Sequence, residues 1–224
     1  AVGIVLHAPF FVATERTRLW LPGPAFGCPV ETLAAYRLSR LPHGIGTYLA
    51  LTGASLSAPE CMSLGLATHM TESHALPRMA DALGEGFSSS ANLPGAGLLG
   101  RISRRLSEAC IEPPSLSAWG PEHALFYAPQ IEEAFTKETL PEIVGALESG
   151  SSEWHVAALE CMRTASPLAL TVTFAQLKLA RTATCWAEAA RAEAESCVAA
   201  GATRDFAAGA SLLQKTKAAA RSEL

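Results

Sequence analysis

The amino-acid sequence predicts an α/β protein in which residues 1–84 mix short strands with helices and residues 123–224 are nearly all helical. Hydrophobic residues make up 49% of the 224 positions and charged residues 17%, which is enough to bury a large core. Beyond Glu153 the chain is rich in alanine and its apolar residues recur with a helical period. Glycine, proline and serine concentrate in residues 85–122, which predicts a connection between the two parts.

Two short strands are expected near the start of the chain. The apolar segments 10–13 and 18–21 each favour a strand, and the polar residues 14–16 between them favour a turn. The Pro-Gly-Pro run at 22–24 then interrupts regular structure.

Helices are expected in the rest of this first part. Residues 31–41 carry leucine and tyrosine at helical spacing, and a second helix over 46–51 should end at Gly53, a residue suited to a helix C-terminus. Ser57 and Glu60 have the spacing of a capping box and predict the start of a third helix.

The connection at 85–122 contains a predicted short helix at 101–109 and the pattern G-x-G-x-x-G at 95–100. That pattern binds dinucleotides only when it follows a buried strand, and here it follows a serine-rich segment. A glycine loop is therefore the favoured interpretation. Arg101, Arg104 and Arg105 either contact a phosphate or form a solvated helix face.

The last part of the chain is expected to hold five helices. One face of the longest carries apolar or small residues from Phe174 to Ala190 at helical spacing. The predicted helices are 130–135, 140–148, 153–164, 168–199 and 206–220.

The net charge of −4 and the pI near 5.9 argue against a protein built mainly to hold nucleic acid through its phosphates. The sequence contains no run of 18 apolar residues, so it predicts no membrane-spanning helix. The apolar start at residues 1–6 lacks the basic flank of a signal peptide, and we expect the chain to begin inside a secondary-structure element.

The cysteines and histidines predict neither a metal site nor a disulfide framework. The six cysteines form no C-x-x-C pair and have no histidine at ligand spacing, so they are expected to be buried reduced thiols in the cytosol or an organelle matrix. No histidine lies in a known catalytic motif, and His69 is expected to be structural.

The turn after the second strand is a candidate reactive position. A glycine-rich turn that leads from a strand into a helix often carries a functional group. The first acid after this turn is Glu31, which on its own is most simply an acid that favours the start of a helix.

Eight short motifs follow one another along nearly the whole chain, and their order can be compared with that of known families. They are FFVATE at 10–15, WLPGPAFG at 20–27, YRLSRL at 36–41, GTYLALTG at 46–53, GLATH at 65–69, GSS at 150–152, Ala-Ser-Pro at 165–167 and RDF at 204–206. In this order they resemble the 3-hydroxyisobutyryl-CoA hydrolase branch of the crotonase (enoyl-CoA hydratase/isomerase) superfamily.

The resemblance implies a crotonase-type spiral of ββα units followed by a helical C-terminal region. On this view residues 1–84 form the last units of the spiral, 85–122 the connection and 123–224 the helical region. The position of Ala1 matches the third glycine of the family's G-G-G-V-G-L segment, so residues 2–7 would continue a central helix. The family's first units and both oxyanion-hole donors would lie upstream of Ala1.

The same resemblance implies damage to the catalytic site. Gly23 stands where the family has its catalytic Glu, and Glu31 stands where the family has a second acid, an Asp. In the family's late motif, Ala208 and Ser211 stand where a Glu and an Arg are expected. Loss of a general acid or base lowers a rate by about 10²–10⁴-fold, so the resemblance implies a protein that keeps the fold without the activity.

Two functions are open at this point. The first is a structural subunit of a larger assembly in the mitochondrial matrix, specifically the small-subunit ribosomal member of the family, with protein partners and rRNA contact. The second is an active acyl-CoA thioesterase of valine breakdown that uses Glu31 and binds a coenzyme A ester. Neither calls for a cofactor, a metal or a membrane.

Overall fold

The computed structural model describes residues 2–88, 95–112 and 120–222. It divides into two compact units. The helical unit comprises Ala1–His7, Trp20–Ser55 and Ala124–Leu224, and the sheet unit comprises Ala8–Leu19 and Leu56–His123. These units describe packing, so the three-part division at 84 and 122 stays a prediction. Ala1 and the parts of the predicted connection at 89–94 and 113–119 lie outside the described residues.

The sheet unit contains two small sheets. Strand β1 (Val12–Thr14) pairs in parallel with β4 (His69–Thr71), and β2 (Arg18–Leu19) pairs antiparallel with β3 (Leu56–Ser57). The two strands expected from the sequence are therefore present but shorter. They pair with segments from about 40 to 60 residues later rather than with each other. The capping box of Ser57 and Glu60 starts α4 (Ala58–Ser63) as predicted.

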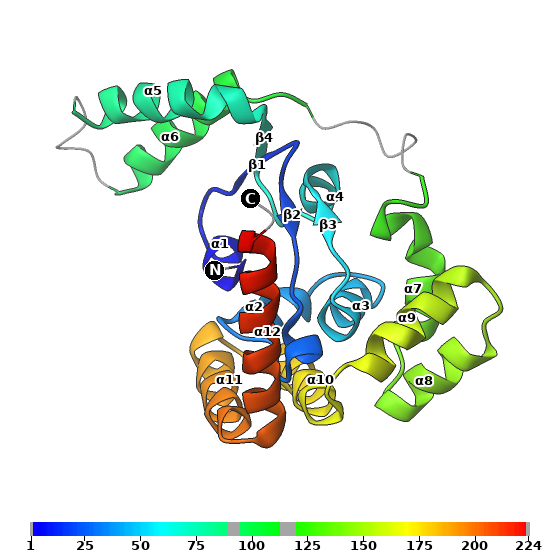
Figure 1. Ribbon diagram of the computed structural model, residues 1–224. Coiled ribbons are helices and arrows are strands. Elements are labelled where there is room, and N and C mark those ends of the chain that lie inside the picture. Colours follow the sequence, from blue (N-terminus) through cyan, green and yellow to red (C-terminus); the bar gives the residue numbers. More distant parts are fainter. Residues whose placement is uncertain (1, 89–94, 113–119, 223–224) are drawn as a thin grey trace. The chain divides into compact units, whose positions relative to one another are not determined.

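A helical hairpin extends from the sheet unit (Figure 1). The short helix η2 (Ser73–Ala75) leads into α5 (Leu76–Ser88), which contacts α6 (Gly95–Ala109). Helix α5 was not expected from the sequence, and the expected glycine loop is wrong, because residues 95–100 are helical. Leu98, Ile102 and Leu106 recur every four residues, and this apolar stripe stabilises α6 despite its glycines.

The helical unit is built around α3 (Ile45–Thr52), which contacts α2 (Ala34–Leu38), α7 (Ala128–Phe135), α9 (Glu153–Thr164) and α10 (Pro167–Thr182). Tyr48 of α3 meets the ring of Phe135 at a centroid distance of 5.2 Å and the ring of Trp154 at 5.6 Å. Gly53 ends α3 with a φ of 68°, as the sequence predicted.

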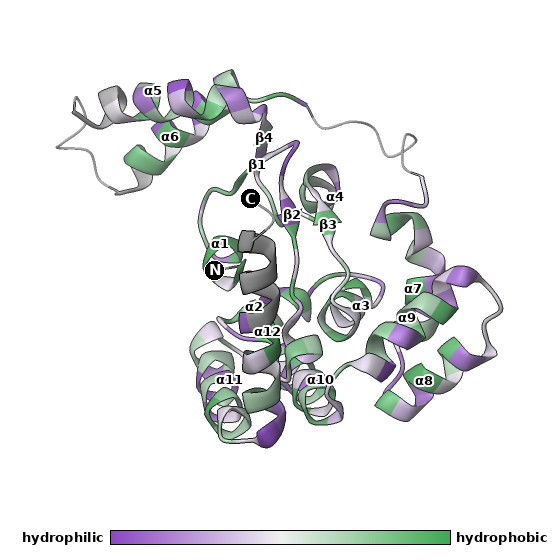
Figure 2. Cartoon of the chain, in the orientation of Figure 1, coloured by the Kyte–Doolittle hydropathy of each residue, from purple (hydrophilic) through white to green (hydrophobic). Residues whose placement is uncertain are grey.

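The remaining helices of this unit cover that centre. Figure 2 shows hydrophilic and hydrophobic residues alternating around α8 and α9, as expected for helices with one solvent-facing side. The elements are α1 (Val2–Leu6), the 3-10 helices η1 (Gly23–Phe26) and η4 (Ala124–Tyr127), α8 (Leu140–Ser149), α11 (Trp186–Gly201) and α12 (Arg204–Ser222).

The prediction of one long helix over 168–199 is wrong. The helix is interrupted between α10 and α11, and these two helices pack on each other. The guanidinium of Arg40 donates to the carbonyl of Ala180 at 2.8 Å and to that of Ala183 at 3.1 Å. It thereby satisfies carbonyls that end α10. Glu188 then accepts hydrogen bonds from the amide and hydroxyl of Thr184 at the start of α11.

Candidate functional site

The turn that carries Gly23 is the 3-10 helix η1. Pro22 and Pro24 restrict the backbone here, and the amide of Cys28 donates to the carbonyl of Gly23 at 3.0 Å. Gly27 ends the turn with a φ of 67°, which glycine adopts without steric cost. Gly23 is therefore held in a rigid, closed turn.

Glu31 lies on a second turn, which enters α2. Thr32 and Leu33 both have left-handed backbones, with φ of 60° and 61°. For residues other than glycine this costs about 1–2 kcal/mol each. The helix expected from residue 31 therefore begins only at Ala34, and the interpretation of Glu31 as the acid at its start is wrong.

A different acid holds the start of α2. Glu193 of α11 is buried, and its carboxylate accepts a hydrogen bond from the amide of Leu33 at 2.5 Å and another from the amide of Ala35. Burial raises the pKa of Glu193, while these two amides and nearby His7 act in the opposite direction. Glu193 was not expected as a site residue, because its sequence context does not distinguish it from exposed Glu195 two residues later.

Gly23 and Glu31 line the same cavity, of about 410 Å³, within the helical unit. Its walls are mostly apolar and include Trp20, Phe26 and Phe206. The family resemblance assigns a catalytic counterpart to each of these two positions, and the fold brings both to one cavity. That the cavity corresponds to an acyl site stays a prediction.

The cavity offers little acid–base chemistry. Among the described residues that line it, the side chains able to titrate are those of Glu31 and Cys28. Burial, with a contribution from Glu31, raises the pKa of Cys28 to about 11, so its sulfur stays protonated at neutral pH and is a poor nucleophile. Glu31 therefore has no proton-transfer partner among these residues.

The backbone occupies the space that a side chain at position 23 would need. A Cβ atom added to Gly23 would lie 2.6 Å from the carbonyl oxygen of Cys28 and 3.1 Å from that of Pro29. Both oxygens belong to the main chain and cannot rotate away. The backbone of this turn thus leaves no space for an acidic side chain at position 23. The position has lost both the carboxylate and the room to hold one.

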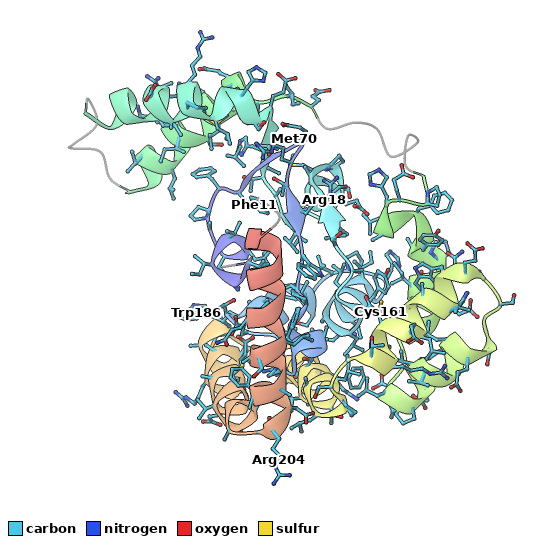
Figure 3. All side chains as sticks on the ribbon, viewed as in Figure 1. Phe11, Arg18, Met70, Cys161, Trp186 and Arg204 are labelled. Atoms are coloured by element: carbon cyan, nitrogen blue, oxygen red, sulfur yellow. The ribbon has the colours of Figure 1, made fainter. Side chains whose placement is uncertain are left out.

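The family landmarks that the chain keeps have structural roles. Ser166 caps α10 by accepting from the amide of Ala169, and its hydroxyl donates to Asp205 at 2.5 Å. Gly209 lets α12 approach η1, because a Cβ there would meet the carbonyl oxygen of Phe26 at 1.7 Å. Arg204, directly before Asp205 in α12, has a side chain that extends away from the helices (Figure 3).

The two substituted positions of the late motif, Ala208 and Ser211, are exposed. The retained residues of that motif therefore fasten α12 to η1 and α10. The charged groups that it lacks would have stood on the exposed side of the same helix.

The other candidates from the sequence lie elsewhere. The ring of His69 forms a hydrogen bond with the hydroxyl of Thr68 at 2.9 Å, and burial lowers the pKa of His69. Both observations agree with a structural residue. All six cysteines are free, and Cys61 is buried as expected. The other five depart from the expectation of buried thiols: Cys161 and Cys185 are exposed, and the remaining three are half-buried. Arg101, Arg104 and Arg105 lie on α6 in the sheet unit.

Within the described residues, no group of three or more metal-binding side chains is assembled. In the same parts of the chain, no helix is both long and apolar enough to cross a bilayer.

Curated proteins similar to this chain fall into two functional groups. The "Probable 3-hydroxyisobutyryl-CoA hydrolase 3" of Arabidopsis thaliana is 30% identical over 80% of this chain and 45% of its own length. The mitochondrial 3-hydroxyisobutyryl-CoA hydrolase of Xenopus tropicalis is 32% identical over 79% of this chain and 44% of its own. The small ribosomal subunit protein mS47 of Arabidopsis thaliana is 31% identical over 80% of this chain and 42% of its own.

The chain thus spans less than half the length of these relatives. Among solved structures, a carnitinyl-CoA dehydratase from Mycobacterium thermoresistibile matches with a TM-score of 0.79 at 23% identity. That match covers 95% of this chain and 57% of the other. It confirms the crotonase fold expected from the sequence. The family model described as enoyl-CoA hydratase/isomerase matches residues 1–220, and the chain therefore belongs to the enoyl-CoA hydratase/isomerase family.

Proposed function

We propose that this chain is a catalytically degenerate relative of the 3-hydroxyisobutyryl-CoA hydrolases and acts as a structural subunit of a larger assembly. The most specific form of the proposal is a protein of the small subunit of the mitochondrial ribosome, located in the mitochondrial matrix. Its partners would be other protein subunits and rRNA.

The closed turn at Gly23 is the observation that carries this proposal. The carbonyl oxygen of Cys28 lies 2.6 Å from the place of a Cβ at position 23, so the backbone excludes the acid that the family resemblance expects there. Among the described residues that line the cavity, the other titratable side chain beside Glu31 is the thiol of Cys28, whose pKa is raised to about 11. Hydrolysis of a thioester needs a positioned base and oxyanion donors together.

The retained landmarks support the same proposal. Ser166, Asp205 and Gly209 hold α12 and α10 in place and take no part in an acid–base pair. A chain that keeps the packing residues of its family and lacks the charged ones is suited to a role that needs the fold alone. The two relatives from Arabidopsis thaliana and Schizosaccharomyces pombe that are named as ribosomal proteins make the ribosome the first assembly to test.

An active hydrolase is the second candidate, and the position of Glu31 favours it. Its side chain lines an apolar cavity of about 410 Å³, which is within the size range of small-molecule sites. In this alternative Glu31 activates water for the hydrolysis of 3-hydroxyisobutyryl-CoA.

One pair of measurements separates the two candidates. The natural full-length polypeptide is incubated with 3-hydroxyisobutyryl-CoA, and free thiol release is followed with a chromogenic disulfide reagent. In parallel, mitochondrial lysate is fractionated on a density gradient. The proposal expects no thiol release above the rate without protein, together with co-migration with the small ribosomal subunit. Release that is lost in Glu31→Gln, and a protein that stays in the light fractions, would establish the hydrolase instead.

A further inference from the structure

The outward side of α6 carries an uninterrupted group of positive charges. Arg101, Arg104 and Arg105 are all exposed, and they lie at positions i, i+3 and i+4 of the helix, which share one side. The opposite side carries Leu106, which is 2% exposed and belongs to the packing between α6 and α5. The hairpin thus fixes which side of α6 faces solvent.

The acid nearest to these arginines along α6 is Glu108, which follows Arg104 by four residues and Arg105 by three and lies on the same side. The sequence has no Asp or Glu between Glu85 and Glu108, a stretch that contains all three arginines. Within the described residues, neither Arg101 nor Arg104 forms an ion pair with a carboxylate. Arg105 donates to the carbonyl of Ala82 at 3.1 Å, which anchors its guanidinium beside α5. The acidic net charge of the whole chain therefore does not describe this surface.

The backbone next to these arginines is also accessible. Gly97 is exposed, and a Cβ at Gly100 would meet nothing within 4 Å. With a rise of 1.5 Å per residue, about 4.5–6 Å along the axis separates Arg101 from the other two arginines. Guanidinium groups bind phosphate oxygens in a bidentate manner. Two guanidiniums at this spacing, beside a backbone free of side chains, suit the successive phosphates of a nucleic acid strand.

We propose that this basic side of α6, formed by Arg101, Arg104 and Arg105, binds the phosphate backbone of RNA. The inference rests on the proposed structural role, for which it names a contact surface and a partner. Phosphate contacts of this kind give affinity and orientation without sequence preference. Because each contact releases counterions, binding should weaken steeply as salt rises.

The test measures binding of the full chain to a fluorescently labelled RNA stem–loop by anisotropy over a series of salt concentrations. The variant is Arg101→Gln combined with Arg104→Gln, since glutamine has a helix propensity close to that of arginine. Arg105 is left in place because of its contact with Ala82. The matched control is Arg181→Gln combined with Arg191→Gln, two exposed arginines on α10 and α11 whose loss changes the net charge by the same amount.

The expected result is that the α6 variant binds at least about tenfold more weakly at moderate salt. The slope of log affinity against log salt should fall by roughly 1.4–1.8, the contribution of two phosphate contacts. The control pair should retain the wild-type slope. Equal losses in both pairs, or an unchanged slope in the α6 variant, would overturn the proposal.

A wild-type chain that ignores the stem–loop but binds an acidic peptide through the same arginines would also overturn it, and would make α6 a protein-binding surface. Failure here is distinguishable from failure of the proposed function. Thiol release and gradient migration test the structural role without use of the labelled RNA. A chain that hydrolyses the thioester and still binds RNA through α6 would contradict the proposed structural role and leave the RNA-binding proposal intact.

Discussion

Replacing Gly209 with alanine is the most direct test of how α12 is held on η1. The new Cβ would lie 1.7 Å from the carbonyl oxygen of Phe26 and 2.2 Å from its carbonyl carbon, whereas ordinary contact begins at 3.4 Å. Both neighbours are main-chain atoms of a proline-bounded turn. The distance from the new Cβ to the Phe26 oxygen would therefore have to double, which requires α12 to move away from η1 and to change the cavity that both segments line.

The magnitude follows from two opposing effects. Alanine in place of a helical glycine stabilises by about 0.5–1 kcal/mol, and an atom forced into a packed contact destabilises by about 1–3 kcal/mol. Gly145 of α8 provides the control, because a Cβ there meets nothing within 4 Å. Gly145→Ala should gain stability, and because the helical gain is common to both variants, Gly209→Ala should unfold with about 1–3 kcal/mol less free energy than Gly145→Ala.

Urea and thermal unfolding followed by circular dichroism measure this difference. In a chain of this size 1 kcal/mol shifts Tm by about 2–4 °C, so the two variants should differ by roughly 2–12 °C. A Gly209→Ala protein that is as stable as the wild type would refute the close approach of α12 to η1.

Three further results are expected. Gly23→Glu should release no more thiol from 3-hydroxyisobutyryl-CoA than the wild type and should lose about 1–3 kcal/mol in urea unfolding, because its Cβ meets the backbone of Cys28; a thousandfold gain in thiol release would contradict the closed turn. Burial raises the folded-state pKa of Glu193 above its ordinary 4.5, so this residue's contribution to stability is complete below pH 4.5 and declines as pH rises through the folded value; Glu193→Gln should remove that decline, and parallel stability–pH curves for the two proteins would count against it. Iodoacetamide should label exposed Cys161 and Cys185 before Cys28, whose pKa of about 11 leaves roughly 100-fold less thiolate than the ordinary value of 9.0, and mass spectrometry that finds Cys28 modified first would show the opposite.

The elements predicted correctly are those with local end signals. Gly53 ends α3, and Ser57 with Glu60 starts α4, because each of these signals acts within one turn of the residue that it caps. Helix α9 has the predicted bounds of 153 and 164, with Ser152 at its N-cap position and the Ser166-Pro167 pair at the start of the next helix.

The errors lie where the determining contact comes from far along the chain. The local signal after Ala180 is weak and consists of Thr184 and Glu188 at the start of α11. The carbonyl of Ala180 is satisfied by Arg40, which is 140 residues earlier. Strand β1 likewise found its partner in β4 rather than in the neighbouring segment. Pattern analysis detects each strand but contains no information on which distant strand completes it.

The candidate site was predicted in part. The resemblance identified Gly23 and Glu31, and both line the cavity. It could not identify Cys28, whose carbonyl closes the turn, because that effect belongs to the backbone and to no side chain type. Glu193 escaped notice since its burial depends on how α11 packs against α2.

The left-handed pair Thr32 and Leu33 makes the turn at Glu31 energetically dependent on a residue of α11. The strain of these two residues, about 1–2 kcal/mol each, is offset by the hydrogen bond from the amide of Leu33 to Glu193, which is 160 positions away. Substitutions at 33 and 193 should therefore be non-additive. When residue 33 is leucine, loss of Glu193 removes the hydrogen bond that holds a strained turn and lowers the free energy of unfolding. When residue 33 is glycine, the same loss lowers it much less, because glycine adopts this backbone without strain. This epistasis restricts the order in which the two positions can change, and a double-mutant cycle on Leu33→Gly and Glu193→Gln would give its size.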